Sequence, residues 1–188
     1  MSQSTVVLLE KALIDELSVK TLSNISVRSL CDKVKITRQA YYYHYNDIYD
    51  LLEHIYISKA EETIGTNKTY DSWIEGFENV FKTMYEYKNF VINTYKSISK
   101  EYLETFLYDV TYDLLYSVIK EKSKLYPSVK ESEISFIAHF YKYAFVGIVL
   151  DWIRHSMNDD YHLIIDNFKT VIDGDFTDAL NSFNKKER

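Results

Sequence analysis

Apolar residues recur at spacings of three and four through most of the chain, which is the period of an α-helix. The first such stripe covers residues 6–17, and a polar stretch at 20–25 predicts a loop after it. Two short apolar stripes follow at 26–34 and 37–45, separated by only Lys35 and Ile36. Asp47 is placed to cap a fourth helix. The N-terminal part therefore reads as two short helices joined by a tight turn and flanked by longer ones.

The remaining two thirds of the chain shows the same helical period with more aromatic residues. Aromatic and aliphatic stripes cover residues 73–85 and 102–115, and Pro127 ends that region. The longest predicted helix, at 132–156, is apolar around most of its circumference, which indicates burial on more than one side. A last amphipathic helix is predicted at 161–172. Gly174 ends it, and the polar tail beyond it gives only a weak structural signal.

Composition supports an all-α fold. Four glycines and one proline in 188 residues are too few for the tight turns of a β-rich fold. The segment 64–70 holds Gly, Thr and Asn and predicts a loop. We therefore predict an N-terminal three-helix helix-turn-helix domain at 1–60 and a C-terminal helical bundle for regulation or dimerisation at 61–188.

Cysteine and histidine usage argues against a disulfide framework, a metal site and most enzyme classes. Cys31 is the single cysteine and lies on an apolar face, which favours packing over nucleophilic chemistry. The five histidines show no metal-ligand spacing, and the motifs of nucleotide-binding loops and of zinc and serine hydrolases are absent. We predict no enzyme activity, no cofactor, no catalytic residue and no metal. Acidic residues follow directly on a short apolar N-terminal run, unlike a signal peptide, so a cytoplasmic location is predicted.

Charge is unevenly distributed along the chain. Residues 20–45 have a balance of +4, whereas the whole chain has a net charge of −6. A basic segment in an acidic protein is a candidate anion-binding face, although a solvated face with chance clustering would look the same.

The two short helices lie within this basic segment, which is the layout of a helix-turn-helix DNA reader. Thr37, Arg38 and Gln39 would offer donors to base edges, since Arg suits guanine and Gln suits adenine. Phosphates would be held by hydroxyl and cationic groups, for which the candidates are Ser26, Thr37, Tyr42, Tyr43 and His44. A plain core stripe at 41–45 is the alternative, but five consecutive rings cannot all point inward from one helix.

The stretch SVRSLCDKVKITRQAYYYHYNDIYDLLEHIY resembles the DNA-binding domain of the TetR/AcrR family of bacterial transcriptional regulators. Within that family, the segment TRQAYYYHYNDIYDLLEHI is similar to the corresponding segment of the activators of dihydroxyacetone-kinase operons. The segment GIVLDWIRHSMNDDY resembles part of their C-terminal domain. The resemblance implies base reading by Arg38 and Gln39 and phosphate contacts by the five residues named above.

Two departures from the family pattern stand out. Lys35 occupies the turn position where the family usually has Gly. Because a left-handed backbone there would strain a non-Gly residue, a differently shaped turn is expected. Ile48 replaces a Lys that commonly begins the fourth helix as a phosphate anchor, which predicts weaker non-specific DNA binding.

The resemblance implies a homodimer whose C-terminal domain senses a small ligand or a protein partner. The predicted helices near 132–156 and 161–172 are the best candidates for the dimer interface, with ordinary core packing as the alternative. Tyr and Phe side chains at helical spacing could line an effector pocket, although such stripes are more often plain core. The candidate pocket residues are Trp73, Phe77, Phe81, Tyr85, Tyr102 and Phe106.

The sequence thus predicts a sequence-specific regulator that reads a palindromic double-stranded DNA operator as a homodimer. A protein-interaction or ligand-binding module, in which the helix-turn-helix serves only as scaffold, remains the alternative. No membrane association is expected, because the longest uncharged apolar run is far shorter than a transmembrane helix requires.

Overall fold

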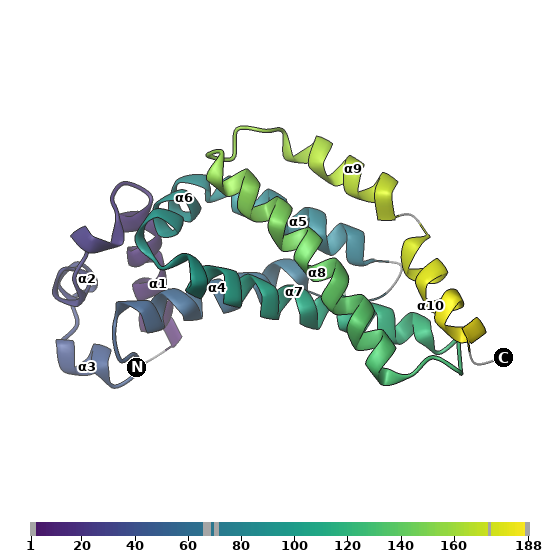
Figure 1. The fold of residues 1–188 in the computed structure, drawn as a ribbon. Coiled ribbons are helices and arrows are strands. Elements are labelled where there is room, and N and C mark those ends of the chain that lie inside the picture. Colours follow the sequence, from purple (N-terminus) through teal and green to yellow (C-terminus); the bar gives the residue numbers. More distant parts are fainter. Residues whose placement is uncertain (1–2, 66–68, 70–71, 173, 187–188) are drawn as a thin grey trace. The chain divides into compact units, whose positions relative to one another are not determined.

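The computed structural model describes residues 3–65, 69, 72–172 and 174–186, and their regular structure is entirely helical (Figure 1). The predicted all-α fold is therefore confirmed. Residues 66–68 and 70 of the loop predicted at 64–70 lie outside the described residues. Ile64 is the last residue of a helix, and Gly65 after it has a left-handed backbone with φ of 53°.

The chain forms two compact units. The first contains residues 1–62 and 84–100, and the second contains residues 63–83 and 101–188. Helix α5 (Trp73–Glu86) has its first part in the second unit and its last three residues in the first. The first unit therefore includes a segment that lies far along the chain from the N-terminal helices.

The first unit is built on α1 (Gln3–Leu17), α2 (Val27–Val34), α3 (Arg38–Tyr42), most of α4 (Ile48–Ile64) and α6 (Lys88–Ser97). A short 3₁₀ helix, η1 (Leu22–Asn24), occupies the predicted loop at 20–25. The core is aliphatic, because α1 and α4 each bury a leucine-rich face. Its most buried members include Leu9, Leu13, Leu17, Leu51, Leu52 and Ile55.

Helix α6 is attached to the first unit by hydrogen bonds that no local pattern predicts. The Asn93 amide donates to the carbonyl oxygen of Leu17 at 2.7 Å, and the backbone N–H of Leu22 donates to Ser97 Oγ at 3.0 Å. The rings of Tyr56 and Phe90 lie 5.4 Å apart and add an apolar contact between α4 and α6. These contacts give the end of α1 partners for backbone groups that a helix terminus leaves open.

The turn between α2 and α3 is left-handed. Lys35 ends α2 with φ of 59° and ψ of 46°, and its N–H donates to the carbonyl oxygen of Cys31. The expectation that Lys in place of Gly would give a differently shaped turn is wrong. The next N–H, from Ile36, also donates to that carbonyl at 3.0 Å, so the hydrogen bonds that close α2 hold the strained residue in place.

The second unit contains most of α5 together with α7 (Lys100–Ser123), α8 (Glu131–Arg154), α9 (Tyr161–Ile172) and α10 (Asp175–Lys186). Its core is aromatic. The Phe77 ring lies 4.5 Å from Phe145 and 5.1 Å from Phe168, which joins α5, α8 and α9. The Phe81 ring lies 5.0 Å from the buried Trp152. Edge-to-face and tilted ring contacts of this kind fix helix positions more tightly than aliphatic burial alone.

Helix α10 occupies the polar tail for which the sequence gave only a weak structural signal and predicted no element. Phe176 and Leu180 are almost completely buried, four residues apart on one face of α10. The Phe176 ring lies 5.3 Å from Trp73 and 4.7 Å from Tyr141. Burial, with the Asp175 carboxylate close by, raises the pKa of Tyr141 to about 12. Packing against α5 and α8 stabilises a helix whose own sequence is largely polar.

Helix α8 is long and apolar enough to cross a membrane by length and composition, with a mean hydropathy of 1.3 over its most apolar stretch. It also carries Lys142 at its centre, and its buried face belongs to the core of the second unit. A core helix of a helical bundle has these same properties, so we assign α8 to the bundle.

The strain at Lys35 gives a test of the turn. Replacing Lys35 with Gly should stabilise the protein by about 0.5–1 kcal/mol, because the relief of left-handed strain outweighs the backbone entropy of glycine. Urea unfolding without DNA measures the change. Lys35→Ala is the matched control, since it keeps the Cβ atom and the strain while it removes the amino group. A glycine variant less stable than the alanine variant would contradict the assigned backbone.

Candidate nucleic-acid interface

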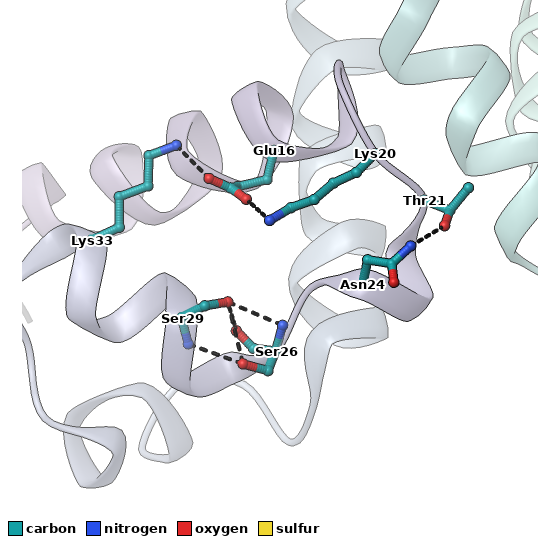
Figure 2. Close-up of polar contacts among 7 residues, drawn as sticks. All are labelled: Glu16, Lys20, Thr21, Asn24, Ser26, Ser29 and Lys33. Carbon is teal, nitrogen blue, oxygen red and sulfur yellow. Dashed lines mark hydrogen bonds and ion pairs between the residues drawn. The ribbon is translucent and has the colours of Figure 1, made fainter.

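Serine and threonine side chains set the start of both helices of the α2–α3 pair. Thr37 Oγ1 accepts a hydrogen bond from the N–H of Ala40 at 3.1 Å and so begins α3. Ser26 Oγ accepts from the N–H of Ser29 at 3.0 Å, and the N–H of Ser26 donates back to Ser29 Oγ at 3.1 Å. Figure 2 shows this reciprocal pair. The sequence predicted the caps at Ser26 and Thr37. It did not predict that the Ser29 side chain accepts the return hydrogen bond, because Glu or Gln usually fills that position.

Two buried tyrosines attach α3 and the residues after it to the first unit. Tyr41 is completely buried, and its hydroxyl donates to the carbonyl oxygen of Asp47 at 2.8 Å. Burial, together with the nearby Asp47 carboxylate, raises the pKa of Tyr41 well above its usual range. Tyr45 is buried four residues later, with its ring 5.6 Å from that of Tyr41. Because these two rings point inward, the three residues between them must face outward.

All side chains predicted to contact DNA are exposed. Tyr42 and Tyr43 retain 55% and 83% of their surface, and His44 is exposed beside them with its ring 4.9 Å from Tyr43. At the other end of α3, Arg38 and Gln39 are exposed as well. The complete exposed set is Ser26, Thr37, Arg38, Gln39, Tyr42, Tyr43 and His44. The α2–α3 pair thus presents cationic, amide and hydroxyl groups on its surface.

The positive charge of residues 20–45 is partly neutralised within the first unit. Glu16 of α1 forms ion pairs with Lys20 and with Lys33, the latter at 2.9 Å (Figure 2). In the loop after α1, Asn24 Nδ2 donates a hydrogen bond to Thr21 Oγ1 at 3.0 Å (Figure 2). Lys20 and Lys33 hold Glu16 ionised and lower its pKa.

Two cations of residues 20–45, Lys35 and Arg38, are available to an external partner. Arg28 lies 3.8 Å from Asp32, with both side chains largely exposed, so this pair is weak. Among the described residues, Lys35 and Arg38 have no carboxylate within ion-pair distance. Since counterions are released only where a Lys or Arg neutralises a phosphate, the number of available cations sets the salt dependence of DNA binding.

The start of α4 carries carboxylates where the family pattern has a lysine. Asp47 Oδ1 accepts hydrogen bonds from the N–H groups of Tyr49 and Asp50 at 2.8 and 3.0 Å, so Asp47 caps α4 as predicted. Asp50 Oδ2 accepts from both the backbone and the side-chain amide of Asn46, each at 2.9 Å. Ile48 between them is half-buried. These groups fix the chain after α3 but offer no cation to a phosphate.

Cys31 is 1% exposed in the core between α1, α2 and α3, where burial raises the pKa of its thiol. A thiol that is held protonated packs as an apolar group, in line with the packing role predicted for it. In the part of the chain that the structure describes, no three His, Cys, Asp or Glu side chains gather as a metal ion would require.

The predicted effector-pocket residues are divided between different environments. Trp73, Phe77 and Phe81 are buried in the aromatic core of the second unit, which is the alternative that the sequence left open. Tyr85 belongs to the first unit and is 48% exposed. Tyr102 is partly exposed and Phe106 half-buried, both on α7. Within the second unit, α5 thus turns the rings of Trp73, Phe77 and Phe81 into the core.

The comparisons with known proteins agree with this arrangement. A TetR-class family model, described as a transcriptional regulator C-terminal region, matches residues 71–174, more than half of the chain. The chain belongs to the TetR family of transcriptional regulators. A solved structure, titled dihydroxyacetone kinase operon activator DhaS, aligns with a TM-score of 0.74 at 21% identity. The alignment covers 92% of this chain and 96% of that one, and it shows a shared fold. No curated protein sequence matches the chain.

A helix-turn-helix follows from membership of the TetR family, and the α2–α3 pair is the candidate for it. The family match begins at residue 71 and does not include this pair. The geometry of the pair and the family match are therefore independent observations, and both are consistent with a transcriptional regulator. The sequence located the exposed residues of α3 correctly because capping and ring periodicity are local. Glu16 was missed because only the fold brings α1 beside α2.

The Glu16 ion pairs predict an acid sensitivity of the first unit. The pKa of Glu16 is lowered in the folded state, so its contribution to stability is present above about pH 4.5 and is lost as the pH falls through the lowered value. Glu16→Gln should cost about 0.5–1 kcal/mol at neutral pH and less at pH 3. Urea unfolding across this pH range measures both, with Glu61→Gln on the exposed side of α4 as control. An equal cost at both pH values would contradict the ion pairing.

Proposed function

We propose that this TetR-family protein is a sequence-specific DNA-binding regulator that acts as a homodimer on a palindromic operator and is modulated through its C-terminal helices. The observation that carries the proposal is the α2–α3 pair. Its base-reading and phosphate-binding candidates are all exposed, while Tyr41 and Tyr45 hold the segment from inside. An effector, either a small molecule or a protein partner, would act by changing the separation of the two recognition helices. The site of action would be the cytoplasm.

Chemistry assigns roles to the exposed residues of α3. Arg38 presents a forked guanidinium that matches the two major-groove acceptors of guanine, and Gln39 presents an amide that matches adenine. Tyr42, Tyr43 and His44 lie on the other end of the segment, where hydroxyl and imidazole groups would contact phosphates. Thr37 Oγ1 accepts the capping bond from Ala40 and still has its own hydrogen to donate to a phosphate.

Helices α8 and α9 carry exposed apolar side chains that support a dimer interface. Phe136 and Phe140 lie four residues apart on α8 and each keep more than half of their surface exposed. Leu163 and Val171 are similarly exposed on α9. At Gly147 an added Cβ would meet nothing within 4 Å, so a second backbone can approach there. Apolar side chains in this number are typical of a surface that another chain covers.

A dimer is needed for specific DNA recognition, because a single short helix contacts too few base pairs. One short recognition helix contacts only a few base pairs, whereas two that are about 34–36 Å apart reach successive major grooves on one face of the duplex. A twofold dimer through α8 and α9 would therefore read a palindrome. Selection of binding sites from a random DNA pool tests the proposal directly, because it should return an inverted repeat. A pool without enrichment would contradict it.

Arg38 is the sharpest test of base reading. Arg38→Ala should weaken binding to the selected site by about 1–3 kcal/mol and relax the preference at one base pair in each half-site. Fluorescence anisotropy on matched and singly mutated duplexes at fixed salt measures both effects. Lys124→Ala, an exposed lysine of the second unit, is the control and should change neither. Unchanged binding by the Arg38 variant would exclude α3 as the recognition helix.

Phe140 tests the dimer interface. Phe140→Glu should convert the dimer into a monomer, because it places a charge at the apolar surface of α8, and affinity for the palindrome should fall to that of one half-site. Light scattering coupled to size-exclusion chromatography gives the mass. Leu125→Glu, which also replaces an exposed apolar residue but lies outside α8 and α9, should leave the dimer intact. A Phe140 variant that stays dimeric would place the interface elsewhere.

A further inference from the structure

The second unit contains a buried lysine with an unusual environment. Lys142, at the centre of α8, retains only 9% of its surface. In the described ranges of the chain it has no carboxylate within ion-pair distance, and Nζ is not among the fully enclosed polar atoms that lack a partner, so its end keeps contact with solvent. A buried charge is normally paired, because removing it from water without compensation is costly.

Three tyrosine rings surround the ammonium group. Lys142 Nζ lies 5.5 Å from the centre of the Tyr108 ring, 5.3 Å from that of Tyr112 and 5.2 Å from that of Tyr143. Ring faces attract a cation within this range, which explains how the charge is tolerated. The rings are not strong hydrogen-bond acceptors, however, and an ammonium group carries three N–H donors and no acceptor. Among the described residues the ammonium group therefore contacts ring faces and no anion, and its N–H donors can point to solvent or to a ligand.

The rings around Lys142 are held in position before any ligand arrives. The Tyr108 and Tyr143 rings pack edge to face at 5.1 Å, which joins α7 to α8. The hydroxyl of Tyr112 lies 3.0 Å from Ser135 Oγ, and its ring lies 4.4 Å from that of His139. Ser135, His139 and Lys142 follow at spacings of four and three, so they share one face of α8. A site that is ordered in advance loses little entropy on binding.

His139 contributes a defined tautomer to this face. Its Nδ1 lies 2.8 Å from the carbonyl oxygen of Ser135, and since a carbonyl oxygen only accepts, Nδ1 carries the hydrogen. The cluster thus combines a cation, phenol groups and aromatic surfaces, while α7 and α8 bring no carboxylate within ion-pair distance of the cation. Such a set of groups suits the oxygens of an anion joined to a flat apolar body.

We propose that Lys142, with Tyr108, Tyr112 and Tyr143, forms a binding site for a small organic anion whose carboxylate or phosphate oxygens accept hydrogen bonds from Nζ. The site differs from the aromatic stripe on α5, whose rings are core. The inference rests on the proposed function only for the role of the anion as an effector. Binding itself is measured without DNA, so its failure and the failure of DNA recognition are distinguishable.

Isothermal titration of the full-length protein tests the site with three probes of similar shape. Benzoate and phenyl phosphate represent the two anion sources, and benzyl alcohol is the uncharged comparison. At least one anion should bind with one site per chain, and benzyl alcohol should not bind measurably. The anion that binds more tightly identifies the source. If neither anion binds, or if benzyl alcohol binds as well as they do, the proposal is wrong.

Variants locate the binding. Lys142→Met keeps the length of the side chain and should weaken anion binding by about tenfold to a hundredfold, as expected for the loss of a charged hydrogen-bond donor. Lys124→Met is the matched control and should bind as the wild type does. The free Lys142→Met protein should melt no lower than the wild type, because methionine keeps the buried stem among the rings and removes a partly desolvated charge. A variant that binds the anion as tightly as the wild type would overturn the assignment.

A measurement on the unaltered protein keeps the proposal testable if the variant fails to fold. Acetic anhydride acetylates lysines in proportion to their access, and peptide mass spectrometry reports each one. Saturating benzoate or phenyl phosphate should slow the acetylation of Lys142 at least about threefold and leave Lys124 unchanged. Equal acetylation of Lys142 with and without the anion that binds would contradict the site.

Discussion

Burial of the Tyr41 ring is the interaction on which the proposed DNA-binding surface depends. Helix α3 spans only five residues, too few to be stable by its own hydrogen bonds. The ring of Tyr41 and its hydrogen bond to the carbonyl oxygen of Asp47 attach α3 to the first unit and to the start of α4. Because Tyr45 is buried on the same side, the residues between the two rings have no orientation left except toward solvent.

Electrostatics refines what the basic segment can do. A positive balance along the sequence suggests a broad anion-binding face, yet Glu16 pairs with two of its lysines and Asp32 lies beside Arg28. The cations left for an external partner are concentrated at the turn and at the start of α3. An interface with few free cations depends more on directional contacts to bases and less on general attraction to the duplex. The carboxylates at the start of α4 also reduce the general electrostatic attraction to the duplex.

The second unit divides its aromatic residues between two uses. Phenylalanine and tryptophan on α5, α8 and α9 pack ring against ring as core. Tyrosines on α7 face α8 and surround the ammonium group of Lys142. Both sets recur at helical spacing in the sequence, so periodicity alone does not separate them. The hydroxyl groups make the difference, because they allow a ring to line a polar environment that phenylalanine would leave unsatisfied.

The sequence by itself determined the all-α class, the caps at Ser26, Thr37 and Asp47, and the outward direction of the α3 side chains, because capping and helical periodicity act over a few residues. It also carried the likeness to the TetR family. The tertiary structure alone decided the ion pairs of Glu16, the joining of α6 to the first unit, the helix at 175–186 and the burial of Lys142. Each of these depends on residues far apart in the chain, whose contacts exist only after the helices have packed together.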